Sequence, residues 1–289
     1  MNVVSAEADA LAGPLRAAVA AHGAAGEIAW LSPERAFDIA FIGEPAEMRT
    51  AARAVAGNIA ADINVVSATN RRKKLLVADM DSTIIGCECV DELADMVGLK
   101  PIIAGITERA MRGELDFPAA LRERVWLLKG LPLDALERVY RERVRLNPGA
   151  RQMVMTMRKH GARALLVSGG FTYFTERVAE DAGFDAQRAN ILLDDGVALN
   201  GKVVEPILGR EAKLKALEEG ATELGISLEE TLAVGDGAND LAMIQVSGLG
   251  VAYHAKPMVA AAASASIDHT DLTTVLYLQG YRDEEFARD

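Results

Sequence analysis

The chain has 289 residues, of which 50% are hydrophobic and 25% are charged. This balance is typical of a soluble globular protein, and the length predicts two or three domains rather than a single core. The net charge of −11 disfavours nucleic-acid binding, which usually requires a basic face. The one tight basic cluster, residues 71–74, is more typical of a solvated patch at a domain junction.

The same features indicate a cytoplasmic protein. The two cysteines, Cys87 and Cys89, are too few for a disulfide framework, and no second Cys/His pair completes a zinc site. Acidic residues precede the first basic residue, Arg16, so the sequence starts unlike a secretory signal. No apolar run approaches the roughly 18 residues of a membrane helix. We therefore expect no membrane segment.

Residues 1–72 form the first predicted domain. Apolar strands and Ala-rich helices follow in the order strand 2–6, helix 8–23, strands 27–32 and 36–43, helix 45–60 and strand 63–69. This β-α-β-β-α-β order is the ferredoxin-like plan, and the domain resembles the ACT-type modules that often bind amino acids. A purely structural or dimerising role is an equally good interpretation, and it would make the protein a homodimer through this domain.

From Lys73 onward the pattern changes to that of a layered α/β domain. The predicted strands are residues 75–79, 162–170, 231–237 and 248–254, and the predicted helices are 149–161, 171–183, 211–225 and 240–248. Fully apolar strands separated by helices indicate a parallel sheet covered on both faces, as in a Rossmann-like core. We assign residues 73–86 and 149–289 to this core domain.

Residues 87–148 interrupt the alternation between the first and second core strands. Gly and Pro divide them into four predicted helices, residues 87–99, 101–113, 116–130 and 132–144. Ligands of parallel sheets bind beyond the carboxyl ends of the strands, so a helical insertion at this point can cover the site. We expect it to form a helical cap domain.

Two carboxylates follow the first core strand directly. Asp79 ends the apolar run, and Asp81 comes two residues later. Such close like charges repel, and burying a carboxylate is unfavourable unless something pairs with it. A solvated turn is the ordinary explanation, and a site that holds a cation and a phosphate is the alternative. Two other strands end at residues 168–170 and 236–237, and a parallel sheet would bring all three ends to one edge.

Four motifs in this order carry a family resemblance. They are DMDST at 79–83, SGG at 168–170, a lysine at a helix start (Lys213) and GDGAND at 235–240. Together they resemble the haloacid dehalogenase superfamily. Longer stretches, DMDSTIIGCECVDELA, TERAMRGELDF, LRERV, VSGGFTYF, GDGANDLAMI and GLGVAYHAKP, resemble the phosphoserine phosphatases within it. The resemblance covers residues 73 to about 275 and leaves residues 1–70 largely outside.

This resemblance implies hydrolysis of O-phospho-L-serine to L-serine and phosphate, the last step of serine biosynthesis. Asp79, the first Asp of its motif, would attack phosphorus and form an aspartyl-phosphate, which splits one difficult step into two easier ones. Asp81 would protonate the leaving oxygen and then take a proton from water. The two carboxylates need different environments for these two roles.

The resemblance also implies a magnesium ion. An anionic nucleophile that meets an anionic phosphate needs a cation between them, and Mg²⁺ prefers oxygen ligands. The expected ligands are the side chains of Asp79 and Asp236 and the backbone carbonyl of Asp81. Asp240 is expected to support the water shell of the metal.

Further residues are expected to bind the phosphate. Ser168 and the Gly169 amide can donate hydrogen bonds to its oxygens, and Lys213 would supply a lasting positive charge. Asn239 would orient the phosphate or Lys213. Without the resemblance, Lys213 would be taken for a surface lysine and Asn239 for a residue at a helix N-terminus.

The predicted cap is expected to select the substrate. The resemblance places Glu88 near the ammonium group of phosphoserine and Arg124 at its carboxylate, which a guanidinium can bind through two hydrogen bonds. Phe117 would close over the substrate, although a core aromatic is the commoner role. Cys87 and Cys89 are assigned to packing.

Two other functions stay open from the sequence. A phosphotransferase would use the same chemistry with another alcohol as the acceptor. An amino-acid-sensing regulator would use residues 1–70 as its sensor, although a complete set of catalytic motifs argues against an inactive enzyme.

Overall fold

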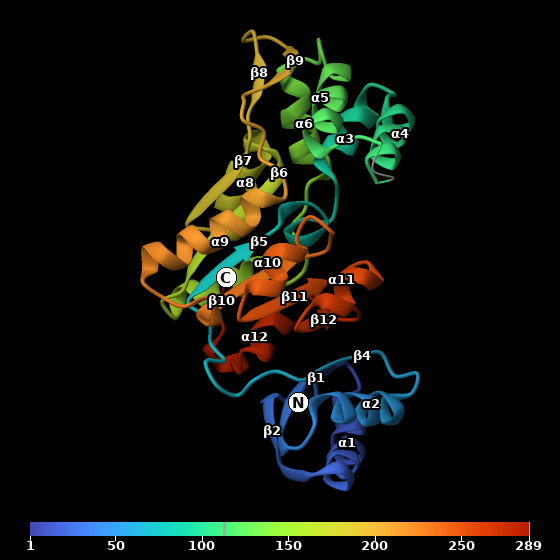
Figure 1. Cartoon of the computed structure of the whole chain (residues 1–289), viewed down its shortest axis with the longest axis vertical. Coiled ribbons are helices and arrows are strands. Elements are labelled where there is room, and N and C mark those ends of the chain that lie inside the picture. Colours follow the sequence, from blue (N-terminus) through green and yellow to red (C-terminus); the bar gives the residue numbers. More distant parts are fainter. Residues whose placement is uncertain (112–113, 289) are drawn as a thin grey trace.

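The computed structural model describes residues 1–111 and 114–288 of the chain. It forms an elongated molecule with a small antiparallel sheet at one end, a layered parallel sheet in the middle and a group of short helices at the other end (Figure 1). Within the described residues, every helix is too short or too polar to cross a lipid bilayer.

The N-terminal part is an antiparallel sheet with two helices on one face. Its elements are β1 (Asn2–Ser5), α1 (Ala8–His22), β2 (Ala24–Ser32), β3 (Ala36–Ile42), α2 (Pro45–Ala56) and β4 (Ala61–Asn64). The strands lie in the order β2-β3-β1-β4. Leu11 and Leu15 of α1 and Met48 of α2 pack on Phe37 of the sheet. The ferredoxin-like plan is therefore confirmed.

The last strand of this sheet differs from the prediction, which placed it at residues 63–69. β4 pairs only with β1, from Ser5 opposite Ala61 to Asn2 opposite Asn64. Because β1 has four residues, the chain beyond Asn64 has no strand to pair with. The length of the partner strand, rather than the apolar pattern of β4 itself, sets where β4 ends.

The core is a six-stranded parallel sheet in the order β12-β11-β10-β5-β6-β7. Its strands are β5 (Leu75–Ala78), β6 (Arg163–Phe171), β7 (Ala186–Asn190), β10 (Thr231–Gly235), β11 (Leu249–Tyr253) and β12 (Ala265–Ile267). Alternate residues of β5 face opposite sides, so that Leu76 and Val77 belong to different apolar clusters. Burial on both faces explains why these strands are apolar throughout.

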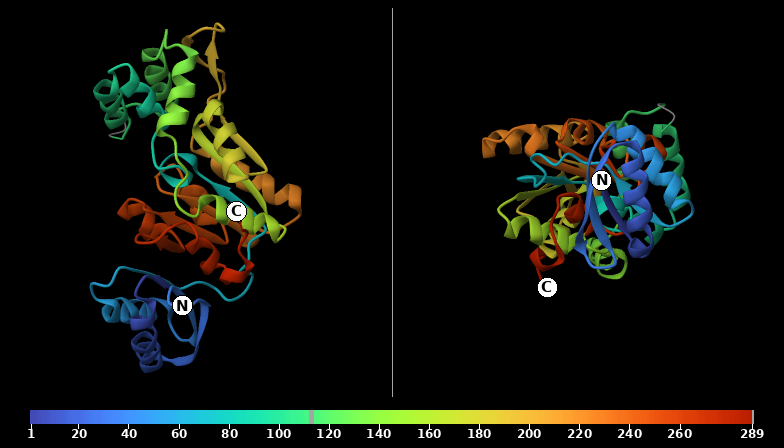
Figure 2. Two further views of the ribbon diagram at one scale, coloured as in Figure 1. Left: turned by 180° about the vertical axis from the view of Figure 1, so that it is seen from behind. Right: turned by 90° about the horizontal axis from the view of Figure 1, so that it is seen from below.

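Helices cover both faces of this sheet (Figure 2). The helices are α7 (Ala150–Lys159), α8 (Thr172–Ala182), α9 (Glu211–Leu224), α10 (Leu241–Val246), α11 (Pro257–Ala262) and α12 (Thr274–Leu278). Met153 of α7 and Phe174 of α8 pack in the cluster of Leu76, whereas Leu217 of α9 packs in the cluster of Val77. The predicted Rossmann-like core is confirmed.

Four strands of the second half were not predicted from the sequence. They are β7, β12 and a two-stranded hairpin, β8 (Leu192–Asp194) and β9 (Leu199–Val203). β7 and β12 are the two edges of the core sheet, and each has one neighbouring strand instead of two. Edge positions do not require continuous apolar runs, so their sequences gave little signal.

Four helices lie between β5 and α7 along the chain, as predicted. They are α3 (Cys89–Met96), α4 (Lys100–Met111), α5 (Phe117–Leu127) and α6 (Leu133–Arg143), and we call them the cap helices. The Asp116 carboxylate caps α5 by accepting from the Ala119 amide at 2.7 Å, and a proline follows in the first turn. Residues 112–113, part of the TERAMRGELDF stretch, lie outside the described residues.

The open face of the N-terminal sheet packs on the core. Val4, Leu31 and Ala36 belong to the same apolar cluster as Leu272 and Tyr277 near the C-terminus. The N-terminal part therefore shares a hydrophobic core with the rest of the chain and is not joined to it by a linker alone.

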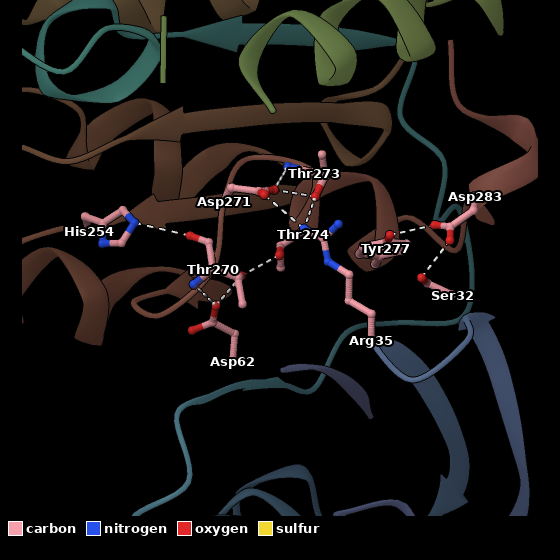
Figure 3. A network of polar contacts seen from close by, with 10 residues as sticks. All are labelled: Ser32, Arg35, Asp62, His254, Thr270, Asp271, Thr273, Thr274, Tyr277 and Asp283. Carbon is pink, nitrogen blue, oxygen red and sulfur yellow. Dashed lines mark hydrogen bonds and ion pairs between the residues drawn. The ribbon is translucent and has the colours of Figure 1, made fainter. Parts of the chain in front are cut away.

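Polar contacts fix this interface (Figure 3). The Asp62 carboxylate accepts from the backbone amides of Asp268, His269 and Thr270 at 2.8, 3.1 and 3.0 Å. Arg35 of the N-terminal part forms an ion pair with a second core carboxylate, and Ser32 donates to a third. These contacts hold the N-terminal sheet against the loop that follows β12 and against the segment that follows α12.

Replacing Asp62 with Ala should weaken this interface. We expect the free energy of unfolding to fall by about 3 kcal/mol, because three backbone amides lose a buried charged acceptor. Chemical denaturation followed by circular dichroism measures this change. Asp9→Ala, which removes an exposed carboxylate of α1, is the control. Equal stability of the two variants would contradict the proposed weight of the Asp62 contacts.

Candidate active site

Three neighbouring strands end in polar residues at one edge of the core sheet. β5 lies between β6 and β10, and parallel pairing sets Ala78 beside Leu166 and Val234. The segments that follow therefore emerge side by side, beneath the cap helices (Figure 1). The predicted motifs at residues 79–83 and 235–240 lie at the ends of β5 and β10, and the motif at residues 168–170 lies in the last part of β6.

The chain turns sharply after β5, and this turn separates the two aspartates. Ser82 adopts a positive φ of 57° within it. Asp79 Oδ1 accepts from the Met80 amide at 2.8 Å. Asp81 Oδ1 accepts from the Cys89 amide at 2.9 Å, and its Oδ2 accepts from Ser168 Oγ at 3.2 Å. The two carboxylates thus have different partners in spite of their closeness in sequence.

A buried lysine pairs with the first aspartate. Lys213 Nζ lies 2.7 Å from Asp79 Oδ1 and 2.5 Å from Asp240 Oδ1, and all three side chains are almost fully buried. Burial favours a lower pKa for Lys213, but the charges of Asp240 and Asp79 outweigh it and raise the pKa above its ordinary value. Lys213 is therefore protonated at neutral pH.

The same cluster carries an excess of negative charge. Burial, followed by the like charge of Asp240, raises the pKa of Asp79 well above its ordinary value, although Lys213 opposes this effect. Burial and Asp240 also raise the pKa of Asp236. One ammonium group cannot neutralise three neighbouring carboxylates, so a further cation would stabilise them.

The carboxylates of Asp79, Asp236 and Asp240 form a candidate metal site, since each offers an oxygen within 4.8 Å of the others. Both oxygens of Asp240 are engaged: Oδ1 by Lys213, and Oδ2 by the amides of Asp236 and Gly237. Thr83 Oγ1 donates to Asp236 Oδ1 at 3.1 Å. Oxygen donors of this kind fit a hard divalent cation.

The end of β6 at residues 168–170 is arranged around the Ser168 hydroxyl, which accepts from the Gly170 amide at 2.8 Å and donates to Asp81. A Cβ atom at Gly170 would lie 3.0 Å from Ser168 Oγ and 3.1 Å from Asp81 Oδ2. The glycine therefore lets the backbone approach both groups closely.

Two charged residues of opposite sign belong to the cap side of the site. Glu88 accepts from Ser82 Oγ at 2.6 Å. The surrounding protein desolvates Glu88, and this effect, followed by the charge of Asp81, raises the pKa of Glu88 to about 7. Desolvation also lowers the pKa of Arg124, while the charges of Asp91 and Glu88 oppose it. These effects place Arg124 within electrostatic reach of Glu88.

Phe117, the first residue of α5, reaches residues 168–170, which are predicted to bind phosphate. A Cβ atom at Gly169 would lie 2.9 Å from Phe117 Cζ, so the ring covers this glycine. The ring also faces Gly209, where a Cβ atom would lie 3.7 Å from Phe117 Cδ1. Phe117 therefore connects the cap helices to the edge of the core sheet.

The structure gathers most of the predicted residues at this edge. Asp79, Asp81, Ser168 and Lys213 are linked by the contacts described above. Asn239 is exposed, and the hydrogen bonds found among the described residues include none between Asn239 and Lys213.

Three contacts of the site were not predicted from the sequence. Asp240, which was expected to support the water shell of the metal, pairs directly with Lys213. Thr83 donates to Asp236, and Asn190 binds the backbone of Gly169 and Leu208. Asp240 and Thr83 lie inside the recognised motifs GDGAND and DMDST, and their polar side chains there were the available signal. Asn190 ends a strand that was not predicted, so its position gave no signal.

Comparisons with known proteins agree with this site. The model of the haloacid dehalogenase-like hydrolases matches residues 76–245. A phosphoserine phosphatase from Polaromonas sp. is 48% identical over 210 residues, which are 71% of this chain and 89% of the relative. The solved structure of a probable phosphoserine phosphatase from Vibrio cholerae is 31% identical with a TM-score of 0.80, over 96% of this chain and 85% of that chain.

A third relative represents a reaction intermediate. It is described as a phospho-aspartyl intermediate analogue of phosphoserine phosphatase, and it is 39% identical with a TM-score of 0.65, over 71% of this chain and 98% of that chain. The chain therefore belongs to the haloacid dehalogenase-like hydrolase family. Within that family it is a phosphatase, and its sequence is similar to those of the phosphoserine phosphatases.

Proposed function

We propose that this enzyme hydrolyses O-phospho-L-serine to L-serine and phosphate, and so completes serine biosynthesis in the cytoplasm. The observation that carries the proposal is the placement of two residues of opposite acid–base character on the cap side of a phosphatase site: Glu88, which accepts from Ser82 Oγ, and Arg124 on α5. Phosphoserine presents an ammonium and a carboxylate beside its phosphate, and these two residues complement them. The names of the similar proteins support the same substrate. Two unpaired cysteines fit a reducing compartment.

The nucleophile in this proposal is Asp79. Lys213 and the Met80 amide both contact Asp79 Oδ1, which orients the carboxylate and leaves Oδ2 for attack on phosphorus. Attack would form an aspartyl-phosphate and release the seryl oxygen. A solved analogue of such an intermediate in a related phosphatase supports this route.

Asp81 is proposed as the general acid and base. Desolvation raises the pKa of Asp81, while the hydrogen bond from Cys89 opposes this rise. A raised pKa favours the protonated carboxyl group, which can give its proton to the leaving oxygen. The resulting carboxylate can then take a proton from the water that hydrolyses the aspartyl-phosphate.

Phosphate oxygens would be bound by Ser168, the Gly169 amide and Lys213, with Asn239 at the exposed side. The ammonium of Lys213 is held in place before substrate arrives, so it needs no reorganisation when charge develops. Phe117 covers Gly169 and would shield the reacting groups from water.

Mg²⁺ is the proposed cofactor. Asp79 and Asp236 would hold it together with the backbone carbonyl of Asp81, and Asp240 would position Asp236 and Lys213. The ion would offset the negative charge that the substrate and the three carboxylates bring together. This role agrees with the excess of negative charge in the buried cluster.

A phosphate-release assay over three related esters tests the proposed substrate. Phosphoserine should have the highest kcat/KM, phosphoethanolamine lacks the carboxylate, and 3-phosphoglycerate carries a hydroxyl in place of the ammonium. We expect kcat/KM to be at least about tenfold lower for phosphoethanolamine and for 3-phosphoglycerate than for phosphoserine, because one charged residue of the site is left unpaired. Chelation of divalent ions should stop all three reactions, and Mg²⁺ should restore them. Equal rates for the three esters would refute the substrate assignment.

The predicted role of Arg124 generates a sharper test. Arg124→Ala should lower kcat/KM for phosphoserine by about 2–5 kcal/mol in transition-state free energy, because a desolvated charge pair is lost. Phosphoethanolamine has no carboxylate, so its lower kcat/KM should hardly change. Lys at this position should restore activity only in part, since it lacks the planar fork. Equal losses on both substrates would assign Arg124 to the fold or to the phosphate.

A further inference from the structure

Asn190 is a buried amide that no step of the proposed reaction uses. It ends β7, the edge strand of the core sheet, and is only 2% exposed. It pairs with Phe171 across the irregular end of β6, so it lies at the same edge of the sheet as the candidate site. A buried amide must satisfy two donors and one acceptor, and its partners therefore reveal what it holds together.

The Asn190 side chain joins two separate segments of the site. Its Nδ2 donates to the Gly169 carbonyl at 2.9 Å and to the Leu208 carbonyl at 3.2 Å. Its Oδ1 accepts from the Leu208 amide at 2.7 Å. Both N–H groups and the oxygen of the amide thus bind either the end of β6 or the segment before α9.

The second of these segments leads directly to the buried lysine. The Ala212 amide donates to the Gly209 carbonyl at 3.1 Å, and the Lys213 amide donates to the Arg210 carbonyl at 3.4 Å. The residues after Leu208 therefore form the first turn that carries Lys213. Asn190 fixes where this turn begins relative to Gly169.

The cap contacts the same two segments. The Phe117 ring covers Gly169 and faces Gly209, as described above. Asn190 therefore joins the two glycine-containing segments that the Phe117 ring contacts. A change in the distance between these segments would alter both the phosphate contacts and the packing of Phe117.

We propose that Asn190 is a positioning residue, which sets the distance between the phosphate-binding end of β6 and Lys213. The proposal rests on the proposed phosphate-binding roles of Ser168, Gly169 and Lys213. It assigns no contact with substrate to Asn190. Its contribution is to hold the Gly169 carbonyl, and so to fix the backbone conformation of Gly169, whose own amide is proposed to bind the phosphate.

Asn190→Asp is the most selective test, because it replaces one NH₂ group by oxygen with little change in shape. The variant keeps the acceptor for Leu208 but sets an oxygen against the Gly169 and Leu208 carbonyls. We measure inhibition by inorganic phosphate during hydrolysis of p-nitrophenyl phosphate by the full-length enzyme. The inhibition constant should rise about tenfold, as expected for weakening one hydrogen bond to a charged group. This constant does not depend on the fraction of enzyme that is folded.

Asn64→Asp is the matched control. Asn64 is also buried and makes the same kind of paired contact, donating to the Ser266 carbonyl at 2.9 Å and accepting from the Ser266 amide at 3.0 Å. It lies at the N-terminal interface, so its variant should lose stability without a change in phosphate inhibition. Asn190→Ser, which retains a donor and an acceptor, provides a second variant if Asn190→Asp does not fold, and it should show a smaller rise.

The outcomes separate this role from a purely structural one. A rise in the phosphate inhibition constant for the Asn190 variants alone supports the proposal. An unchanged constant in a folded Asn190 variant, or an equal rise in Asn64→Asp, overturns it. Inhibition by L-serine, which carries no phosphate, should stay at the wild-type level. The comparison of the three esters decides the substrate assignment separately, and the phosphate result decides the role of Asn190 in either case.

Discussion

The ammonium group of Lys213, buried between Asp79 and Asp240, is the interaction on which the rest of the site depends. It joins three segments that are far apart in sequence: the turn after β5, the start of α9 and the turn after β10. It also leaves the cluster negative, because three carboxylates surround one cation. A buried site with this excess of charge is suited to a divalent cation, and the two cations together would suit an anionic phosphate.

The fold supports this arrangement in two ways. The central position of β5 brings its carboxyl end between those of β6 and β10, so the three motifs meet without long loops. The shared apolar cluster and the Asp62 contacts hold the N-terminal sheet on the C-terminal part of the core (Figure 3). The cap helices reach the same edge from the other side through Phe117.

The sequence predicted the parts of this molecule whose physical requirements are local. Fully apolar strands such as β5 can only be buried on two faces, whereas Asp79, Ser168 and Lys213 were identified through the family resemblance of their motifs. Edge strands and the end of β4 were missed because partner strands, and not their own residues, define them. Asn190 was missed for a similar reason, since its importance lies entirely in tertiary contacts.

The central claim is that Asp79 is the nucleophile, and a phosphopeptide measurement tests it most directly. Enzyme mixed with phosphoserine and Mg²⁺ is quenched in acid during turnover, digested and analysed by mass spectrometry. The account predicts a base-labile phosphoryl group on the peptide that contains Asp79. In Asp79→Asn it predicts that this phosphoryl group is absent and that turnover is lost. A phosphoryl group on another residue, or phosphate release by Asp79→Asn at the wild-type rate, would contradict the claim.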